Sequence, residues 1–181
     1  MQNIWHDISP DRIKPESFMA VIEISKSCKN KYELDKDTGL LMLDRVLYTS
    51  THYPANYGFI PRTYAQDNDP LDVLVLCQED ILPMTLVKCI PIGVIKMIDQ
   101  TEEDEKIIAI AENDPSHAEY KDVSQLPKHI LLEICHFFEV YKNLENKTTV
   151  IQELLGRDEA VAIIEKCINN YQEKFGDRKK A

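Results

Sequence analysis

Three aspartates, Asp67, Asp69 and Asp72, lie within the six residues DNDPLD, directly before the apolar run VLVLC. A tight turn needs only one such side chain together with Pro70. An EF-hand calcium loop would place an oxygen ligand and then a glycine where Leu71 and Asp72 stand, so that pattern fails. The remaining interpretation is a magnesium-type site, in which a few carboxylates and several waters meet a phosphate group.

A second acidic run, DQTEEDEK, covers residues 99–106. Most runs of this kind are solvated loops between strands. Together with DNDPLD it would give two carboxylate clusters that could converge on metal ions. Phosphate also requires positive charge, and the basic residues in the segments of interest are Lys31, Arg45, Lys106 and Lys142. Arg45 offers a planar fork for phosphate oxygens, whereas lysines offer point charges. Hydroxyl donors are available from Tyr53, Tyr57 and Tyr141.

The strands that would position these residues follow from apolar, β-branched segments. Strands are predicted at 18–25, 72–77, 86–99 and 106–111, with a bulge or bend in the third near Pro91 and Gly93. Residues 31–45 predict a hairpin around the turn DKDTG. Residues 49–66 predict a long aromatic-rich loop, and the alternative of a short strand within it stays open.

Alternation along the strands places acids where apolar neighbours are expected. Glu23 shares a face with Met19 and Val21, and Lys31, Glu33 and Asp35 share another. A lone charge at a strand end is usually solvated. The repetition favours a polar patch at one mouth of a barrel.

Helices are predicted late in the chain, after Pro127 and over residues 157–175, where apolar residues recur at helical spacing. The closing residues GDRKKA are expected to be frayed. The sequence therefore predicts an α+β fold in a single domain over residues 1–181: a five-stranded, OB-like antiparallel β-barrel core with two C-terminal helices.

Composition limits the function classes. Lys and Arg number 21 and Asp and Glu number 31, a formal charge of −10. This balance argues against nucleic-acid binding and suits oxygen ligation of hard cations. The five cysteines are scattered without a CxxC pair, which predicts buried thiols in a reducing compartment and no zinc site. The first ten residues resemble neither a signal peptide nor a membrane span, so a cytoplasmic protein without membrane association is expected.

These motifs closely resemble the soluble family I inorganic pyrophosphatases of the compact bacterial type. DNDPLDV is similar to that family's signature, and VIEI, KYELDKDTG, LDR, YPANYGFIP, PIGVIKMID, EDEK and HFFEVYKNLE resemble family segments in the family order. The resemblance covers about residues 15 to 145, and the C-terminal helix more loosely. One departure is Gln100, since many relatives carry an acid directly after the position of Asp99.

The resemblance implies roles residue by residue. The implied metal ligands are Asp67, Asp72, Asp99, Asp104 and Glu23. Asp69 is implied to be the general base, with Tyr57 as its hydrogen-bond partner. The implied phosphate contacts are Lys31, Arg45, Tyr141 and Lys142. Supporting positions in the site are Glu33, Tyr53 and Lys106.

The implied activity is Mg²⁺-dependent hydrolysis of pyrophosphate to two orthophosphates, with several Mg²⁺ per subunit and Mn²⁺ or Zn²⁺ as possible substitutes. Two metal ions roughly 4 Å apart would activate the attacking water, Asp69 would steer its remaining proton, and the basic residues would neutralise the leaving phosphate. Bacterial members of the family form hexamers, so a homohexamer is expected.

Three other interpretations stay open. The barrel could be a binding module for nucleic acid or another partner, which the acidic charge disfavours. It could be an inactive relative, or a phosphatase for nucleotides or longer polyphosphates. His129 and His136 lie on one face of a predicted helix and are interpreted as buried or subunit-contact residues in preference to metal ligands. Trp5 and His6 carry no functional signal in the sequence.

Overall fold

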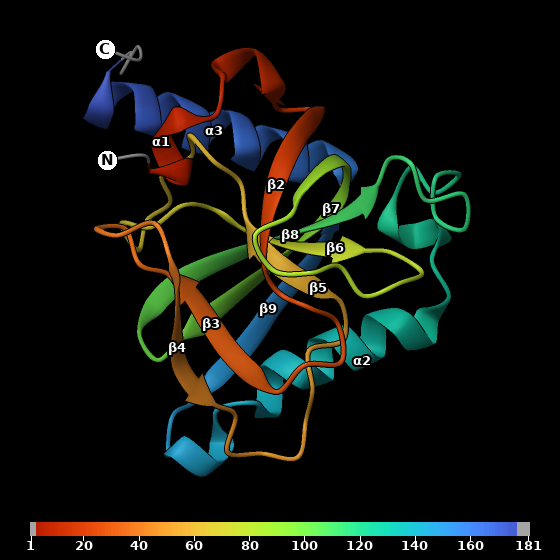
Figure 1. The fold of residues 1–181 in the computed structure, drawn as a ribbon. Helices are drawn as coiled ribbons and strands as arrows, with labels where there is room; N and C mark the ends of the chain where they lie inside the picture. The colour runs from red at the N-terminus through yellow and green to blue at the C-terminus, as the bar shows by residue number, and fades with distance from the viewer. Residues whose placement is uncertain (1–2, 177–181) are drawn as a thin grey trace.

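The computed structural model describes residues 3–176 (Figure 1). Most of the predicted fraying at the C-terminus, residues 177–181, lies outside the described residues. A seven-stranded mixed sheet has the order β1-β2-β5-β6-β8-β7-β9. Its strands are β1 (Ile13–Lys14), β2 (Ser17–Ile24), β5 (Asn56–Phe59), β6 (Asp72–Leu76), β7 (Leu86–Asp99), β8 (Glu102–Ala111) and β9 (Thr149–Gly156).

An unbroken ring of pairings joins five of these strands in the order β2-β5-β6-β8-β7, because β2 also pairs with β7. The predicted all-antiparallel arrangement is wrong at one place: β6 and β8 are parallel. The reason is that β7 does not return beside β6 but pairs with β2 and β8. Its hairpin partner β8 therefore reaches the free edge of β6 running in the same direction. This pairing matters for the site, since it sets Asp72 opposite Lys106.

Five strands form the ring, as predicted for the barrel, but the described residues contain more strands than these, seven in the large sheet and two in a separate hairpin. The hairpin predicted at 31–45 is present as β3 (Asn30–Leu34) and β4 (Leu41–Val46), but it forms a separate two-stranded sheet. Strand β9 was not predicted; it separates the two long helices along the chain and covers the second edge of β7. Most β9 side chains are exposed or half-buried, so its sequence lacks the apolar run that marks a buried strand.

The long strand β7 bends where predicted, with a register shift between Pro91 and Gly93. The strand after it starts earlier than predicted, at Glu102 instead of Lys106. Gln100 takes a left-handed backbone conformation (φ 60°) and, with Thr101, closes the β7–β8 turn. The acidic run 99–106 is therefore mostly paired strand, so the interpretation as a loop is wrong, although Glu102 and Glu103 are exposed to solvent.

Both predicted helices are present, as α2 (Lys128–Val140) and α3 (Arg157–Phe175), together with a short α1 (Ile4–Asp7). Short 3₁₀ turns occupy Pro10–Arg12, Val123–Gln125 and Asn143–Glu145. The α3 residues Ile163 and Ile164 and the α2 residues Phe137 and Phe138 are buried in two different core clusters. The two helices thus cover opposite sides of the strands (Figure 1).

All five cysteines are free, and of these Cys89 and Cys167 are buried. No helix between residues 3 and 176 is long and apolar enough to cross a membrane.

Candidate active site

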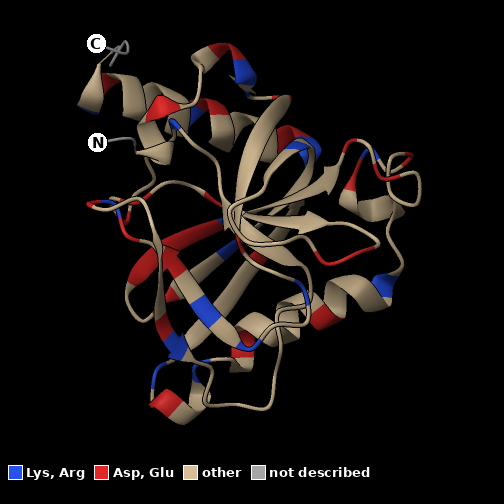
Figure 2. Ribbon diagram, viewed as in Figure 1, with Lys and Arg blue, Asp and Glu red and all other residues tan. Residues whose placement is uncertain are grey.

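One polar cavity collects most of the residues that the sequence pointed to. The predicted residues that line it are Glu23, Lys31, Glu33, Tyr57, Asp67, Asp69, Asp72, Asp99, Asp104, Lys106, Tyr141 and Lys142. They come from six strands, the 67–72 turn and the end of α2. Figure 2 shows charged segments of the β3–β4 hairpin close to the charged end of the β7–β8 hairpin. The two predicted residues outside the lining are Arg45 and Tyr53.

The segment DNDPLD is a turn that leads into strand β6. Asn68 has a left-handed backbone (φ 69°), a conformation that asparagine tolerates better than most residues. The Asp67 side chain accepts the Asp69 amide at 3.0 Å, and the Asp69 carbonyl accepts the Ala65 amide at 2.8 Å. The turn thereby carries Asp67 and Asp69 to the cavity, while Asp72 is the first residue of the strand.

Lys106 is the central cation of the cavity. Its side chain is only 3% exposed, and its Nζ lies 2.7 Å from Asp72 Oδ2 and 2.9 Å from Asp104 Oδ1. Burial by itself would lower the pKa of this ammonium group, but Asp104 and Asp72 outweigh it and raise the pKa well above its usual value. Lys106 therefore stays charged and neutralises carboxylates from two parallel strands.

Tyr57 contacts a different aspartate from the one predicted. Its hydroxyl donates to Asp72 and accepts from Lys106 at 3.2 Å, whereas the Asp69 carboxylate bonds to Lys36. Burial, followed by the charge of Asp72, raises the tyrosine pKa well above its usual value. The predicted Tyr57–Asp69 bond is wrong because β5 and β6 pair directly, with Phe59 opposite Asp72, while Asp69 lies outside the strand on the turn.

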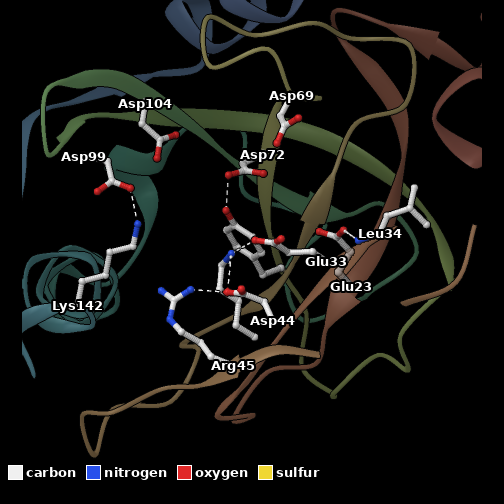
Figure 3. A network of polar contacts seen from close by, with 12 residues as sticks. Glu23, Glu33, Leu34, Asp44, Arg45, Asp69, Asp72, Asp99, Asp104 and Lys142 are labelled. Atoms are coloured by element: carbon white, nitrogen blue, oxygen red, sulfur yellow. Dashed lines mark hydrogen bonds and ion pairs between the residues drawn. The ribbon is translucent and has the colours of Figure 1, made fainter. Parts of the chain in front are cut away.

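Two buried polar atoms lack a partner among the described residues: Asp99 Oδ1 and Arg45 Nη2. The other Asp99 oxygen accepts a bond from Lys142 (Figure 3). Arg45 donates its Nε to Glu145 Oε1 at 2.8 Å and a further bond to Asp44. A buried acceptor without a donor suits a cation, and a buried donor without an acceptor suits an anion.

The acids crowd one another. Burial, then the charges of Asp72, Asp104 and Asp69, raises the pKa of Asp67 to about 6. Glu23 is 8% exposed and accepts the Leu34 amide at 2.7 Å, yet burial raises its pKa to about 8. Added cations would relieve both effects.

The donor set fits a hard cation such as Mg²⁺, because every candidate ligand is a carboxylate and Asp99 Oδ1 has an unused lone pair. Between residues 3 and 176, however, no three acidic, histidine or cysteine side chains are close enough to share one ion. The ammonium groups of Lys106 and Lys142 lie against Asp72, Asp104 and Asp99 instead. Metal binding therefore requires side chains to change partners.

Six residues that were not predicted for the site also line the cavity: Trp5, Tyr32, Leu34, Lys36, Phe59 and Pro70. Lys36 and Trp5 matter most, because Lys36 bonds Asp69 and Trp5 contacts Lys36. Lys36 belongs to the β3–β4 turn, where a lysine is ordinarily solvated, and Trp5 belongs to α1. No local pattern could have placed either one here, since each arrives through contacts that span the chain.

A family model described as inorganic pyrophosphatase matches residues 20–172. The chain belongs to the inorganic pyrophosphatase family. This confirms the predicted soluble family I membership and, with it, the predicted enzyme class of inorganic diphosphatase.

Curated relatives and solved structures support the same family assignment. It is 50% identical over 175 residues to "Soluble inorganic pyrophosphatase 2" of Chlamydomonas reinhardtii, covering 97% of this chain and 91% of that one. It is 51% identical to "Soluble inorganic pyrophosphatase PPA1" of Solanum tuberosum, covering 93% and 80% of the two chains. The solved pyrophosphatase of Helicobacter pylori superimposes with a TM-score of 0.86 at 45% identity, covering 88% and 96%.

Proposed function

We propose that this chain hydrolyses inorganic pyrophosphate to two orthophosphates and that Mg²⁺ is its metal. The observation that carries the proposal is the convergence of carboxylates and lysines from segments far apart in the sequence on one cavity. The unpartnered Asp99 Oδ1 and Arg45 Nη2 add one site for a cation and one for an anion. We assign the ring of five strands to an OB-like barrel and residues 1–181 to one pyrophosphatase domain.

The proposed metal ligands are Asp67, Asp72, Asp99, Asp104 and Glu23. Bound there, Mg²⁺ would lower the pKa of the attacking water and neutralise charge on the phosphates. Several ions per subunit are proposed, and Mn²⁺ or Zn²⁺ are proposed substitutes.

Asp69 is the proposed general base. Its side chain faces the cavity and is 55% exposed, so substrate and water can reach it. Lys36 bonds one carboxylate oxygen, which leaves the other to accept a proton from water. Tyr57 supports the reaction indirectly, because it holds Asp72.

The proposed phosphate contacts are Lys31, Arg45, Tyr141 and Lys142. In the structure Lys31 pairs with Glu33, Lys142 with Asp99, and Arg45 with Asp44 and Glu145. A bound polyanion would compete with these carboxylates for the same cations. Glu33, Tyr53 and Lys106 are proposed to support the site, Tyr53 by packing against Tyr57 and Phe137.

The decisive experiment measures phosphate release from pyrophosphate with Mg²⁺ and with excess chelator, and compares ATP and tripolyphosphate as substrates. We expect Mg²⁺-dependent turnover of pyrophosphate and much slower turnover of the other two. Activity that persists in chelator would remove the metal from the proposal. Asp69→Asn should lower kcat by about 10²- to 10⁴-fold, whereas Asp80→Asn, at an exposed position outside the cavity, should not change it.

We further propose a cytoplasmic homohexamer. The outward face of α2 supports a subunit contact, because Leu132 is 65% exposed and His129 and His136 beside it are exposed. The alternative expectation of buried histidines is wrong. Sedimentation velocity tests the proposed hexamer. Leu132→Glu should reduce the number of subunits in the assembly. A monomeric wild-type protein would contradict the proposal.

A further inference from the structure

Lys36 reaches the cavity from the β3–β4 turn and bonds Asp69 Oδ1, across 33 residues of sequence. Among the described residues, Lys36 is the side chain that donates a hydrogen bond to the Asp69 carboxylate. Other lysines of the cavity pair with different acids: Lys31 with Glu33, and Lys142 with Asp99. Lys36 is therefore the cation specific to Asp69.

Trp5 holds Lys36 in place. The Lys36 ammonium lies 5.3 Å from the centroid of the Trp5 ring, a cation–π contact. At the N-cap of α1, the short helix that contains Trp5, Asn3 Nδ2 donates to the Lys36 carbonyl at 2.9 Å. The α1 segment thus contacts both the backbone and the charged end of this lysine, which limits the positions that the ammonium can take.

Trp5 is also bonded to the loop that carries the aspartates. Its indole Nε1 donates to the Thr63 carbonyl at 2.9 Å, and its carbonyl accepts the Arg62 amide at 2.9 Å. The Thr63 hydroxyl in turn accepts the Leu71 amide at 2.8 Å, so both ends of the 63–71 segment are fixed. One side chain therefore joins the loop that presents Asp69 to the turn that presents Lys36.

We propose that Lys36, held by Trp5, is a positioning residue that orients the Asp69 carboxylate for proton transfer. This inference rests on the proposed role of Asp69 as general base. Fixing Oδ1 leaves Oδ2 to receive the proton, and a base performs well only when it is held within hydrogen-bond reach of its water. The pair itself is exposed, 39% for Lys36 and 55% for Asp69, and such pairs contribute little stability. Its removal should therefore change turnover without unfolding the protein.

Steady-state kinetics with Mg²⁺ and pyrophosphate test the inference. Lys36→Met keeps the apolar stem and removes the charge, and should lower kcat by about 10-fold or more while KM stays within about twofold. Lys36→Arg should recover most of the loss. Lys88→Met is the matched control, because Lys88 forms an exposed pair with Glu112 at 2.7 Å, away from the cavity; its kinetics should equal the wild type's.

Three kinetic results would overturn the inference. Unchanged kcat in Lys36→Met removes any role, and a raised KM with intact kcat makes Lys36 a substrate contact. Equal losses in Lys36→Met and Lys36→Arg would mean that a positive charge at position 36 does not support turnover. An inactive wild-type protein would instead contradict the proposed function.

Fluorescence gives a readout that needs no turnover, because Trp5 is the only tryptophan of the chain. Its emission depends on the charge beside its ring. Asp69→Asn should shift the emission in the wild-type background, where Lys36 loses its partner, and leave it unchanged in the Lys36→Met background. Equal shifts in both backgrounds, or no shift in either, would refute the coupling.

Discussion

Replacing Lys106 with methionine removes the buried ammonium group that lies between Asp72 and Asp104 and keeps most of the side-chain volume. The two carboxylates, 27% and 16% exposed, would then face each other without a counter-charge. Breaking a buried ion pair by removing one partner costs about 3–5 kcal/mol. Because both acids keep some contact with water, we expect a loss near the lower end, about 3 kcal/mol.

Urea unfolding in excess chelator, at fixed protein concentration, measures this loss. With a slope of about 2 kcal/mol per molar urea, the midpoint should fall by about 1.5 M. Added Mg²⁺ should then narrow the gap between variant and wild type by about 1 kcal/mol or more, because carboxylates that lose their lysine bind a cation more tightly.

The control is Lys88→Met, which breaks an exposed pair with Glu112 and should cost under about 0.5 kcal/mol. Two results would refute the reasoning about Lys106. One is a loss no greater than the control's, which would mean that the acids do not need the ammonium group. The other is a gap that Mg²⁺ leaves unchanged, which would separate these carboxylates from metal binding.

Three further predictions follow from single contacts. Burial raises the pKa of Glu23 from 4.5 to about 8, so between these pH values the folded state holds a proton that the unfolded state has lost. Without metal, the free energy of unfolding should therefore fall by about 1.4 kcal/mol per pH unit as the pH rises from 4.5 to 8. Glu23→Gln, which can still accept the Leu34 amide, should flatten that slope in urea unfolding at pH 5 and pH 8.5 with chelator. Gly58→Ala would place its Cβ 1.8 Å from the Val21 carbonyl oxygen, so it should lose more than about 4 kcal/mol or fail to fold, and a cooperative melt like the wild type's would contradict the β2–β5 pairing. Arg45→Lys removes the unpartnered Nη2 and should raise KM for pyrophosphate by about 10-fold, and an unchanged KM would exclude Arg45 from phosphate binding.

Local sequence patterns predicted the elements that carry their own signal. The strands around Val21 and Val73, the bend at Pro91 and Gly93, and the α3 helix all lie where predicted, because each has an apolar period or a backbone constraint within a few residues. The edge strand β9 was not predicted, because most of its side chains are exposed or half-buried and it has no continuous apolar run. The parallel pairing of β6 with β8 was not predicted either, because it depends on which edge of β6 is reached by a strand distant in the sequence.

The sequence by itself determined the chemistry of the site: the spacing of Asp67, Asp69 and Asp72, the second acidic run, and the family to which both belong. Only the tertiary structure decided which partner each group meets. Tyr57 bonds Asp72 because strand pairing brings them together, and Lys36 bonds Asp69 because α1 folds against both loops. Residue types are written locally in the chain, whereas ion pairs depend on side-chain positions within a few ångströms, and those positions are set by the packing of the whole fold.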